Sequence, residues 1–538
     1  MSEAKTVHEV TYDLLRTLGL TTVFGNPGST EQTFLQDFPD DFTYVLGLQE
    51  ASVLAMADGF AQSTGQPALV NLHTAAGTGN AMGSLVAAYR ANTPLIVTAG
   101  QQTREMSLCD PYLNNPDATM LPQPWVKWAY EPARAEDVPA AFMRAYAVAT
   151  QPPAGPVFLS IPLDDWNKPA LGAAVVRTVS RRVEPDTERL AEFADRISRA
   201  KRPLLVLGPE VDRAGAWDAG VAFAEKLRAP VRGSALSDRC SFPEDHPLYR
   251  GPLPMTIAGV SDALAEYDLV IVIGAQVFRY YPYVAGDYLP EGTAVLQVTA
   301  DPHLAATAPV GDSLIGDPRV VLEQLLHLVQ EPADREPPAS PARTPSADLP
   351  MASAPLTSND VYAALRSVKP EDAAVVMEST STMADLLTWW PTRRPGSFFA
   401  TGSGGIGWGV PAAVGIALGD RARGVQRTVV ASIGDGSFQY SIQAIWTAAQ
   451  HKLPVVFVVH RNGEYAILKS FALLEKTPEV PGLDLPDLDI ASLARGFGCR
   501  TATVDGTEEL IREFKAALDA DGPTVLMVPT QPQLPFLG

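Results

Sequence analysis

Two polar turns near the C-terminus contain residue types that bind metal ions and diphosphates. The turn GDGS at residues 434–437 follows the apolar run TVVASI, and the turn NG begins at Asn462 after the apolar run PVVFVVH. Asp435 and Asn462 offer a carboxylate and an amide oxygen, the hard ligands that Mg²⁺ prefers while it bridges phosphates. The backbone N–H groups of GDGS, at the start of the helix expected next, are suited to diphosphate oxygens. Each turn alone is more often a simple tight turn or a capping aspartate. Together, at the ends of two neighbouring strands, they predict a diphosphate and metal site.

A third glycine-rich stretch, GSGGIG at residues 402–407, matches the dinucleotide-binding pattern G-x-G-x-x-G. That pattern should follow a central strand and open a βαβ unit. The preceding residues, SFFAT, are not typical of a central strand. We therefore interpret this stretch as a glycine turn that lets the backbone approach a ligand closely.

The segment QVFRYYPY, residues 276–283, places three tyrosines, a phenylalanine and an arginine directly after the apolar run DLVIVIG. Ligands of open α/β sheets bind beyond the carboxyl ends of the strands. The segment is therefore either packing or one wall of an active site, and its residues alone leave both interpretations open.

These turns require parallel strands to position them, and the chain has the pattern for such strands throughout. Short β-rich runs alternate with amphipathic stretches, which predicts the α/β class with three doubly wound parallel-sheet domains. The predicted strands are TTVFG, YVLGL, PALVNLH, PLIVTAG and VFLSIP, then PLLVLG, APVRGSA, DLVIVIG and TAVLQVTAD, and finally AAVVMES, TVVASIG, PVVFVVH and PTVLMVP.

The 538 residues are too many for one hydrophobic core, so we expect about three domains. The expected boundaries are residues 1–180 for the first domain, 186–331 for the second and 353–538 for the third. Residues 332–352 are rich in Pro, Ala and Ser without hydrophobic periodicity, which indicates an interdomain linker.

The overall composition excludes several classes of function. The formal net charge of −20 argues against binding nucleic acid or an anionic membrane, because both need a basic surface. No apolar run approaches membrane-spanning length, and the polar N-terminus has no secretory signal pattern. Cys109, Cys240 and Cys499 are widely separated and match no zinc spacing, which favours a reducing, cytoplasmic location.

The motifs together resemble those of the thiamine-diphosphate (ThDP) enzymes, within which the chain is most similar to the benzoylformate decarboxylase group. Besides GDGS and NG, the resemblance rests on VFGNPGSTE, LQEASVLAMADGFAQ, NLHTAAGTGNAMG, PLIVTAGQQTR, MESTST and AAQHKLPVVFVV, and it covers essentially the whole chain. It implies a ThDP-binding fold with a pyrimidine-binding domain, a middle domain and a diphosphate-binding domain. It also implies a homo-oligomer, with a dimer as the minimum and a tetramer as the usual form, because such enzymes bind each cofactor between two subunits.

The resemblance implies ThDP and Mg²⁺ (or Ca²⁺) as cofactors. Glu50 matches the glutamate that shares a proton with the aminopyrimidine ring and so activates the cofactor, a task suited to a carboxylate in an apolar cleft. Asp435, Asn462 and the backbone carbonyl of Glu464 match the metal ligands. The other cofactor contacts implied by the resemblance are Thr380, Ser381, Gly404, Ile406, Gly434, Gly436, Ser437 and Tyr465, with Ile406 as the wedge that keeps the cofactor bent.

On the substrate side, Ser29 and His73 match the polar pair that faces a 2-keto acid. The resemblance implies that Ser29 binds the substrate carboxylate and that His73 protonates the oxygen of the attacked ketone. Without the resemblance, a turn serine and a strand-end histidine would be interpreted as structural. Further pocket residues implied by position are Leu113, Tyr281, Ala400, Ile467, Leu468 and Phe471, with Tyr112 beside them.

The sequence departs from the benzoylformate decarboxylase pattern around this pocket. Tyr281 stands where that group has a second catalytic histidine, and a phenol of ordinary pKa about 10 is a poorer acid at neutral pH than an imidazole of about 6.5. Ala400 replaces a phenylalanine, which should enlarge the aryl side of the pocket. Arg461 replaces an asparagine, and Glu464 replaces a small hydroxyl residue, a change that the sequence does not explain.

The leading functional hypothesis is a lyase: ThDP- and Mg²⁺-dependent, non-oxidative decarboxylation of an aromatic or other bulky 2-keto acid to the aldehyde and CO₂. The alternative is a carboligase or lyase that forms or cleaves 2-hydroxy ketones. Tyr281 and Ala400 favour the alternative, because slower protonation and a larger pocket would let a second aldehyde react. A third hypothesis is a ThDP-fold protein without catalytic activity, against which Glu50 argues. The sequence shows no distinct signature of a flavin-dependent relative.

Overall fold

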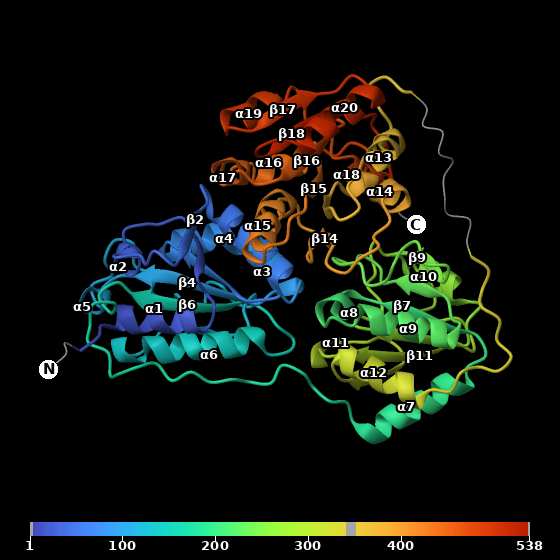
Figure 1. Cartoon of the computed structure of the whole chain (residues 1–538), viewed down its shortest axis with the longest axis horizontal. Coiled ribbons are helices and arrows are strands. Elements are labelled where there is room, and N and C mark those ends of the chain that lie inside the picture. Colours follow the sequence, from blue (N-terminus) through green and yellow to red (C-terminus); the bar gives the residue numbers. More distant parts are fainter. Residues whose placement is uncertain (1–3, 341–350, 536–538) are drawn as a thin grey trace.

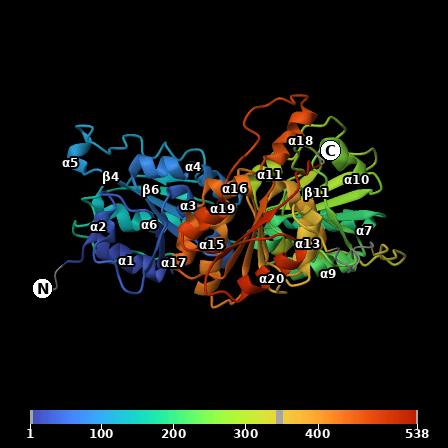
Figure 2. The same cartoon turned by 90° about the horizontal axis from the view of Figure 1, so that it is seen from above.

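Three six-stranded parallel sheets form three successive parts of the chain in the computed structural model, which describes residues 4–340 and 351–535 (Figure 1). Helices are interleaved with the strands in every part, so the predicted fold class is confirmed. Residues 341–350, most of the second half of the expected linker, lie outside the described residues. In the view of Figure 2 the C-terminal part, in orange and red, lies between the blue N-terminal part and the green middle part.

The first sheet has the strand order β2-β1-β3-β4-β6-β5, with every neighbouring pair parallel. Parallel strands covered by helices on both faces read as continuous apolar runs, as β3 and β4 do. The strands are β1 (Thr22–Gly25), β2 (Thr43–Leu46), β3 (Ala68–Leu72), β4 (Leu95–Gln101), β5 (Ala129–Tyr130) and β6 (Val157–Pro162), and the helices are α1 (Val7–Thr17), α2 (Gln32–Leu35), α3 (Glu50–Thr64), α4 (Thr74–Arg90), α5 (Arg104–Ser107), η1 (Ala135–Asp137) and α6 (Val138–Thr150).

The middle sheet has the order β12-β11-β10-β7-β8-β9, so its first strand lies at the centre and the chain extends the sheet on both sides. Its apolar core is separate from that of the first sheet. The strands are β7 (Pro203–Leu207), β8 (Val231–Gly233), β9 (Tyr249–Pro252), β10 (Leu269–Ile273), β11 (Ala294–Thr299) and β12 (Asp312–Ile315), and the helices are α7 (Thr187–Arg199), α8 (Pro209–Arg213), α9 (Trp217–Leu227), α10 (Ile257–Leu264), α11 (Pro302–Ala306) and α12 (Pro318–Leu328).

The C-terminal sheet has the order β14-β13-β15-β16-β18-β17. Its adjacent central strands β15 and β16 end at the two polar turns, GDGS at residues 434–437 and NG at residues 462–463. The strands are β13 (Ala374–Glu378), β14 (Phe398–Ala400), β15 (Val429–Gly434), β16 (Val455–Arg461), β17 (Arg500–Thr503) and β18 (Thr524–Pro529), and the helices are α13 (Ser358–Arg366), η2 (Thr380–Thr382), α14 (Met383–Trp389), α15 (Gly409–Ala422), α16 (Asp435–Tyr440), α17 (Ala444–Gln450), α18 (Ala466–Leu474), α19 (Ile490–Gly496) and α20 (Thr507–Leu518).

Helix α3 carries Glu50 as its first residue and is buried along nearly its whole length. Its N-cap residue Gln49 accepts hydrogen bonds from the amides of Ala51 and Ser52 at 2.7 and 3.2 Å, which satisfies donors that a helix start leaves open. The helix ends at Gly65, which adopts the left-handed conformation (φ 66°) typical of a glycine after a helix. Local sequence signals thus define both ends of the helix that positions Glu50.

Helix α3 of the N-terminal part packs directly on α15 of the C-terminal part (Figure 1). Two glycines make this close approach possible. A Cβ atom on Gly59 would lie 2.3 Å from the carbonyl oxygen of Ala412, and one on Gly415 would lie 1.9 Å from that of Met56. One apolar cluster accordingly contains residues of both parts, so Glu50 and the segment before α15 belong to one packed body.

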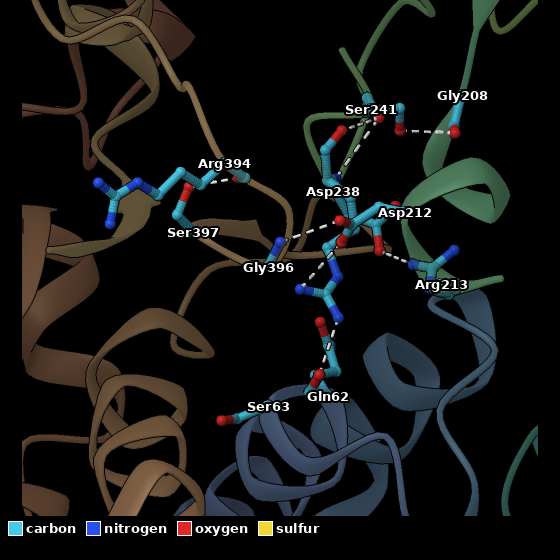
Figure 3. A network of polar contacts seen from close by, with 12 residues as sticks. Gln62, Ser63, Gly208, Asp212, Arg213, Asp238, Ser241, Arg394, Gly396 and Ser397 are labelled. Atoms are coloured by element: carbon cyan, nitrogen blue, oxygen red, sulfur yellow. Dashed lines mark hydrogen bonds and ion pairs between the residues drawn. The ribbon is translucent and has the colours of Figure 1, made fainter. Parts of the chain in front are cut away.

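The three parts meet at Arg239, a buried side chain of the middle part. Its Nη2 atom donates to the carbonyl oxygen of Gln62 on α3 at 2.9 Å, and its guanidinium lies 4.3 Å from the ring centroid of Phe399 on β14. Nearby, Asp212 accepts a hydrogen bond from the Gly396 amide at 2.9 Å, as the polar network in Figure 3 shows. Burial lowers the pKa of Arg239 from its usual value. The middle part is thereby fixed to α3 and to the strand that leads into the glycine segment.

Among the described residues, no helix is both long and apolar enough to cross a membrane.

Candidate active site

Glu50 lies at the start of α3 in the N-terminal part, where it is 8% exposed. Its two carboxylate oxygens accept hydrogen bonds from the side-chain amides of Asn26 at 3.1 Å and Asn80 at 2.9 Å. Asn26 follows β1 and Asn80 lies in α4, so two further elements orient the carboxylate. The sequence analysis did not select either asparagine, although both lie inside the motifs VFGNPGSTE and NLHTAAGTGNAMG.

His73 lies in the same region, between β3 and α4, and is oriented by a buried carboxylate. Its Nδ1 atom is 2.9 Å from Glu31 Oε2 and 3.2 Å from Thr30 Oγ1. Glu31 is 1% exposed and also accepts from the backbone amides of Gly28 and Gly100, both at 2.9 Å. A Cβ atom on Gly28 would lie 2.0 Å from His73 Nδ1, so only glycine allows the loop to pass this close. Glu31 is a site residue that the sequence analysis missed.

Ser29 belongs to the same loop after β1 and is exposed. The structure therefore brings Ser29, Glu50 and His73 to the carboxyl edge of the first sheet, as expected for ligand-facing groups.

The predicted diphosphate turn begins as β15 ends, and Asp435 is the first residue of α16. Asp435 is 3% exposed, and its two oxygens accept from the amides of Gly436 at 2.9 Å and Gly463 at 2.8 Å. Burial raises the pKa of Asp435, against the lowering effect of these amides. Among the described residues it has no ion pair with Lys, Arg or His. A buried carboxylate without an ion-pair partner is a group that a bound metal ion would neutralise.

The second polar turn lies beside the first because β15 and β16 are parallel neighbours. Asn462 directly follows β16, and its Oδ1 atom accepts from the Glu464 amide at 3.1 Å. The two neighbouring turns thus contain carboxylate, amide and backbone carbonyl oxygens, donor types that suit a hard divalent cation. The described parts of the chain contain no cluster of three or more His, Cys, Asp or Glu residues that could hold a metal ion. The expected site would use only one side chain of these four types, that of Asp435.

The diphosphate turn has no space for larger residues. A Cβ atom on Gly436 would lie 2.4 Å from the ring of Tyr465, so Tyr465 packs directly on the turn. Ser437 is also largely buried.

Thr380 and Ser381 are the first two residues of the short helix η2 after β13, which lies next to a buried polar network. Thr382, the last residue of η2, forms a hydrogen bond with Tyr362 Oη at 2.7 Å. The same Oη is 2.7 Å from Ser432 Oγ and 3.1 Å from His460 Nε2. Burial lowers the pKa of His460 to about 4, so it is neutral near pH 7. This network joins η2, β15 and β16, the three elements that lead into the expected cofactor contacts, and the sequence analysis did not find it.

The glycine segment at residues 402–407 follows the edge strand β14, which agrees with our interpretation that it is not a dinucleotide motif. Gly404 and Gly407 have φ angles of 77° and 102°, which favour glycine, and Ile406 between them is half-buried. The segment is held at its end by Glu378, whose oxygens accept from the amides of Trp408 at 2.9 Å and Gly409 at 3.0 Å. Burial raises the pKa of Glu378 to about 7.

Tyr281 is 56% exposed, and its ring lies 4.9 Å from that of Phe471 on α18, centroid to centroid. Its loop is anchored by hydrogen bonds from the Tyr281 amide to the Met255 carbonyl at 2.8 Å and from Arg279 to the Leu236 carbonyl at 3.0 Å. Phe278 is buried, whereas Tyr280 is half-buried with its pKa raised to about 12 by burial. QVFRYYPY therefore contains both packing residues and two exposed aromatic side chains, Tyr281 and Tyr283, the latter 80% exposed.

The other expected pocket residues differ in their surroundings. Ile467 and Leu468 lie in the first turn of α18, and Leu468 is 45% exposed. Ala400 is 4% exposed on β14, inside an apolar cluster of the C-terminal part. Leu113 is half-buried with φ 65°, and Tyr112 beside it is 89% exposed.

The Glu464 side chain is ion-paired with Lys469 of α18 and exposes 11% of its surface. Lys469 is thus the partner of the Glu464 carboxylate, which the sequence alone did not explain. Burial raises the pKa of Asp435, and the positive charge of Arg461 acts against this rise; nothing further in the structure explains Arg461.

The candidate site residues fall into two groups, one in the N-terminal part and one in the C-terminal part. In the described ranges, no hydrogen bond or ion pair joins Glu50, His73 or Ser29 to the GDGS turn or to Asn462.

Comparisons with known proteins match each part of the chain to a family. Residues 5–120 match the thiamine pyrophosphate enzyme N-terminal TPP binding domain, residues 190–325 the central domain and residues 379–528 the C-terminal TPP binding domain.

Similar full-length proteins include the benzoylformate decarboxylase of Pseudomonas aeruginosa, which is 48% identical over 98% of this chain and 99% of its own length. A solved structure of a candidate thiamin diphosphate-dependent enzyme from Mycobacterium smegmatis is 76% identical, with a TM-score of 0.95 over 98% of this chain and 100% of its own. The structure of a thiamine diphosphate-dependent 4-hydroxybenzoylformate decarboxylase from Rhodococcus jostii is 43% identical, with a TM-score of 0.94 over 98% of this chain and 99% of its own.

Proposed function

The chain belongs to the thiamine-diphosphate-dependent enzymes, and on that premise we propose that it decarboxylates benzoylformate-like 2-keto acids without oxidation, releasing the aldehyde and CO₂. The similarity to decarboxylases of two aromatic 2-keto acids, over nearly the whole chain, is the observation that carries this proposal. The arrangement of Ser29, His73 and Glu50 along one sheet edge supports it.

When bound, ThDP supplies a nucleophilic carbon and an electron sink for the decarboxylation. Glu50 fits the task of exchanging a proton with the cofactor's pyrimidine ring, because it is a buried carboxylate whose geometry Asn26 and Asn80 fix. The glycine segment with Gly404 and Ile406 would contact the other side of the cofactor, because its glycines let the backbone approach a ligand closely. Thr380, Ser381 and the GDGS turn would hold the diphosphate, with Tyr465 packed against Gly436.

Ser29 and His73 are assigned to the substrate. Ser29 would donate a hydrogen bond to the substrate carboxylate, since its side chain is exposed at the sheet edge. His73 would deliver a proton to the developing alkoxide from its Nε2 atom, because Glu31 engages Nδ1. Glu31 thus determines which ring nitrogen is available.

We assign Mg²⁺ (or Ca²⁺) to Asp435, Asn462 and the backbone carbonyl of Glu464. Support comes from the buried Asp435 carboxylate, which has no ion-pair partner among the described residues, and from the oxygen donors in the neighbouring turn. The metal would neutralise Asp435 and the diphosphate together.

The functional unit in this proposal is a homo-oligomer. A dimer is the minimum, and a tetramer is the usual form. The lack of polar contacts between the two groups of site residues, in the described ranges, supports it, because a second chain would bring the complementary group to each one. Large apolar side chains exposed on the loop after β4 also support it, namely Leu108 at 95%, Tyr112 at 89% and Met120 at 65%. We further propose a cytoplasmic location, which agrees with three cysteines that form no disulfide.

Carboligation of aldehydes is the second candidate, and Tyr281 is the observation that favours it. A phenol at this position is a weaker acid than the histidine of the benzoylformate decarboxylase pattern, so the decarboxylated intermediate would survive longer and meet a second aldehyde.

A substrate panel separates the two functions. We expect the holoenzyme to consume benzoylformate and 4-hydroxybenzoylformate with a higher kcat/KM than pyruvate or branched 2-keto acids, and to release free aldehyde. Benzoin cleavage without consumption of any keto acid would contradict the decarboxylase proposal and support the carboligase.

A further inference from the structure

Lys469 lies between two carboxylates that belong to different segments of the C-terminal part. Its Nζ atom is paired with Glu464 Oε2 and lies 2.6 Å from Asp484 Oδ1. Lys469 is on α18, Glu464 is in the turn after β16, and Asp484 is in the segment between α18 and α19. Three separate pieces of chain are therefore joined through one ammonium group.

The turn after β16 is also clipped to the Asp484 segment by backbone hydrogen bonds. The Tyr465 amide donates to the Leu483 carbonyl at 2.8 Å, and the Leu485 amide donates to the Gly463 carbonyl at 2.7 Å. These bonds flank an antiparallel bridge between Glu464 and Asp484. A Cβ atom on Gly436 would lie 2.4 Å from the Tyr465 ring and 3.1 Å from Leu485, so the clip packs on the diphosphate turn itself.

Helix α18 has little apolar anchorage of its own. The residues that it buries are Ala466, Ser470 and Ala472, all small, whereas Leu468 is 45% exposed and Leu473 is 61% exposed. Apolar burial contributes in proportion to area, so these small residues stabilise the docking of the helix only weakly. Polar contacts at its first turns therefore have a large share in fixing its position.

The same helix carries the side chains assigned to the substrate wall, Ile467, Leu468 and Phe471, and Phe471 contacts Tyr281 of the middle part. The ion-pair partner of Lys469, Glu464, is assigned to the metal through its backbone carbonyl. In this assignment Glu464 would offer its carbonyl to the metal, while its carboxylate is paired with Lys469 of α18.

We propose that Lys469 is a positioning residue that couples the metal site to the substrate wall through Glu464, an inference that rests on the proposed function of this site. A bound metal ion fixes the backbone at residue 464, the Glu464 carboxylate then fixes Lys469, and α18 is held with its apolar side chains against the substrate. By reciprocity, α18 held in place by Lys469 strengthens metal binding. An isolated exposed ion pair contributes little to stability, so the effect is expected in metal affinity and substrate KM rather than in thermal stability.

The test uses the intact homo-oligomer with ThDP and with Mn²⁺ as the probe metal. Lys469→Met should weaken Mn²⁺ binding about 3- to 10-fold by calorimetry, raise KM for benzoylformate by a similar factor, and change kcat less than about two-fold. Lys469→Arg should restore most of the affinity. Glu464→Gln combined with Lys469→Met should cost no more than Lys469→Met alone, because both changes remove the same contact. Bound Mn²⁺ should also protect residues 475–488 from protease in the wild type more than in Lys469→Met.

Lys452→Met is the matched control, since it removes an exposed ion pair to Asp521 away from the site and should leave Mn²⁺ affinity unchanged. Unaltered Mn²⁺ affinity in Lys469→Met, or additive losses in the double variant, would overturn the coupling while the proposed function stands. A wild-type protein that binds neither Mn²⁺ nor ThDP would overturn the proposed function and the coupling with it.

Discussion

The Nδ1 atom of His73 lies 2.9 Å from a carboxylate oxygen of Glu31, a side chain that is 1% exposed. Glu31 is itself held by two backbone amides and by the Thr30 hydroxyl at 2.6 Å, so it has little freedom to move. A carboxylate fixed in this way orients an imidazole and selects which ring nitrogen is free, as in other acid–base pairs. In the proposed reaction His73 donates the proton, and Glu31 holds His73 in position.

Replacing Glu31 should therefore lower catalysis without removing the cofactor. Glu31→Gln is expected to reduce kcat about 10- to 100-fold, because His73 loses its orienting acceptor. ThDP affinity, measured by calorimetry, should stay within about two-fold. In a His73→Ala background the Glu31 change should add little, since the group it orients is gone. Additive losses in the double variant would show that Glu31 acts on something else.

Tyr281 controls the partition between free aldehyde and 2-hydroxy ketone in this account. Tyr281→His should speed aldehyde release and reduce the fraction of carboligation product, since imidazole is the stronger acid near pH 7. Product ratios from benzoylformate with and without acceptor aldehyde measure the effect. Tyr281→Phe serves as the control, because it keeps the ring in contact with Phe471 but removes the hydroxyl. An unchanged product ratio in the histidine variant would assign Tyr281 to packing.

Glu378 should make stability depend on pH. Its pKa is about 7 in the folded chain because of burial, against 4.5 as its ordinary value. The raised pKa stabilises the fold below about pH 4.5, and this contribution, at most about 3 kcal/mol, is lost as the pH rises through 7. From pH 5 to 8, Tm should therefore fall by a few degrees more in the wild type than in Glu378→Gln. Glu479→Gln, an exposed change, should follow the wild type, and parallel Tm curves for all three proteins would refute the assignment.

Gly436 tests whether the GDGS turn needs its close contact with Tyr465. Gly436→Ala should weaken ThDP binding at least about 10-fold, because the added methyl would lie 2.4 Å from the Tyr465 ring and must displace it. Gly83→Ala on α4 is the control, since a Cβ atom there meets nothing within 4 Å. Equal ThDP affinity in Gly436→Ala and the wild type would argue against the assigned diphosphate site.

The sequence predicted the central strands and the polar turns at their ends, because a strand with neighbours on both sides reads as an unbroken apolar run. It missed β5, β9, β12, β14 and β17, which all lie at sheet edges. An edge strand is paired on one side only and is short, so its residues carry a weaker pattern.

The missed site residues have a different cause. Glu31 and His73 are 42 positions apart and meet because β1 pairs with β3, and Glu378 meets Trp408 across 30 positions. No local period encodes such contacts. The Glu464 to Lys469 pair is close in sequence, yet it depends on where α18 begins, which the sequence analysis did not specify. Residue types could thus be predicted from motifs, whereas their partners required the tertiary structure.

The most direct test of the central claim is the stoichiometry of one reaction. Protein freed of cofactor, given benzoylformate with ThDP and Mg²⁺, should release benzaldehyde and CO₂ in a one-to-one ratio, and should release neither without ThDP. Glu50→Gln should bind ThDP yet lose at least about 100-fold in rate. Benzoylformate left unconsumed by the wild type, or a Glu50→Gln variant with full turnover, would contradict the account.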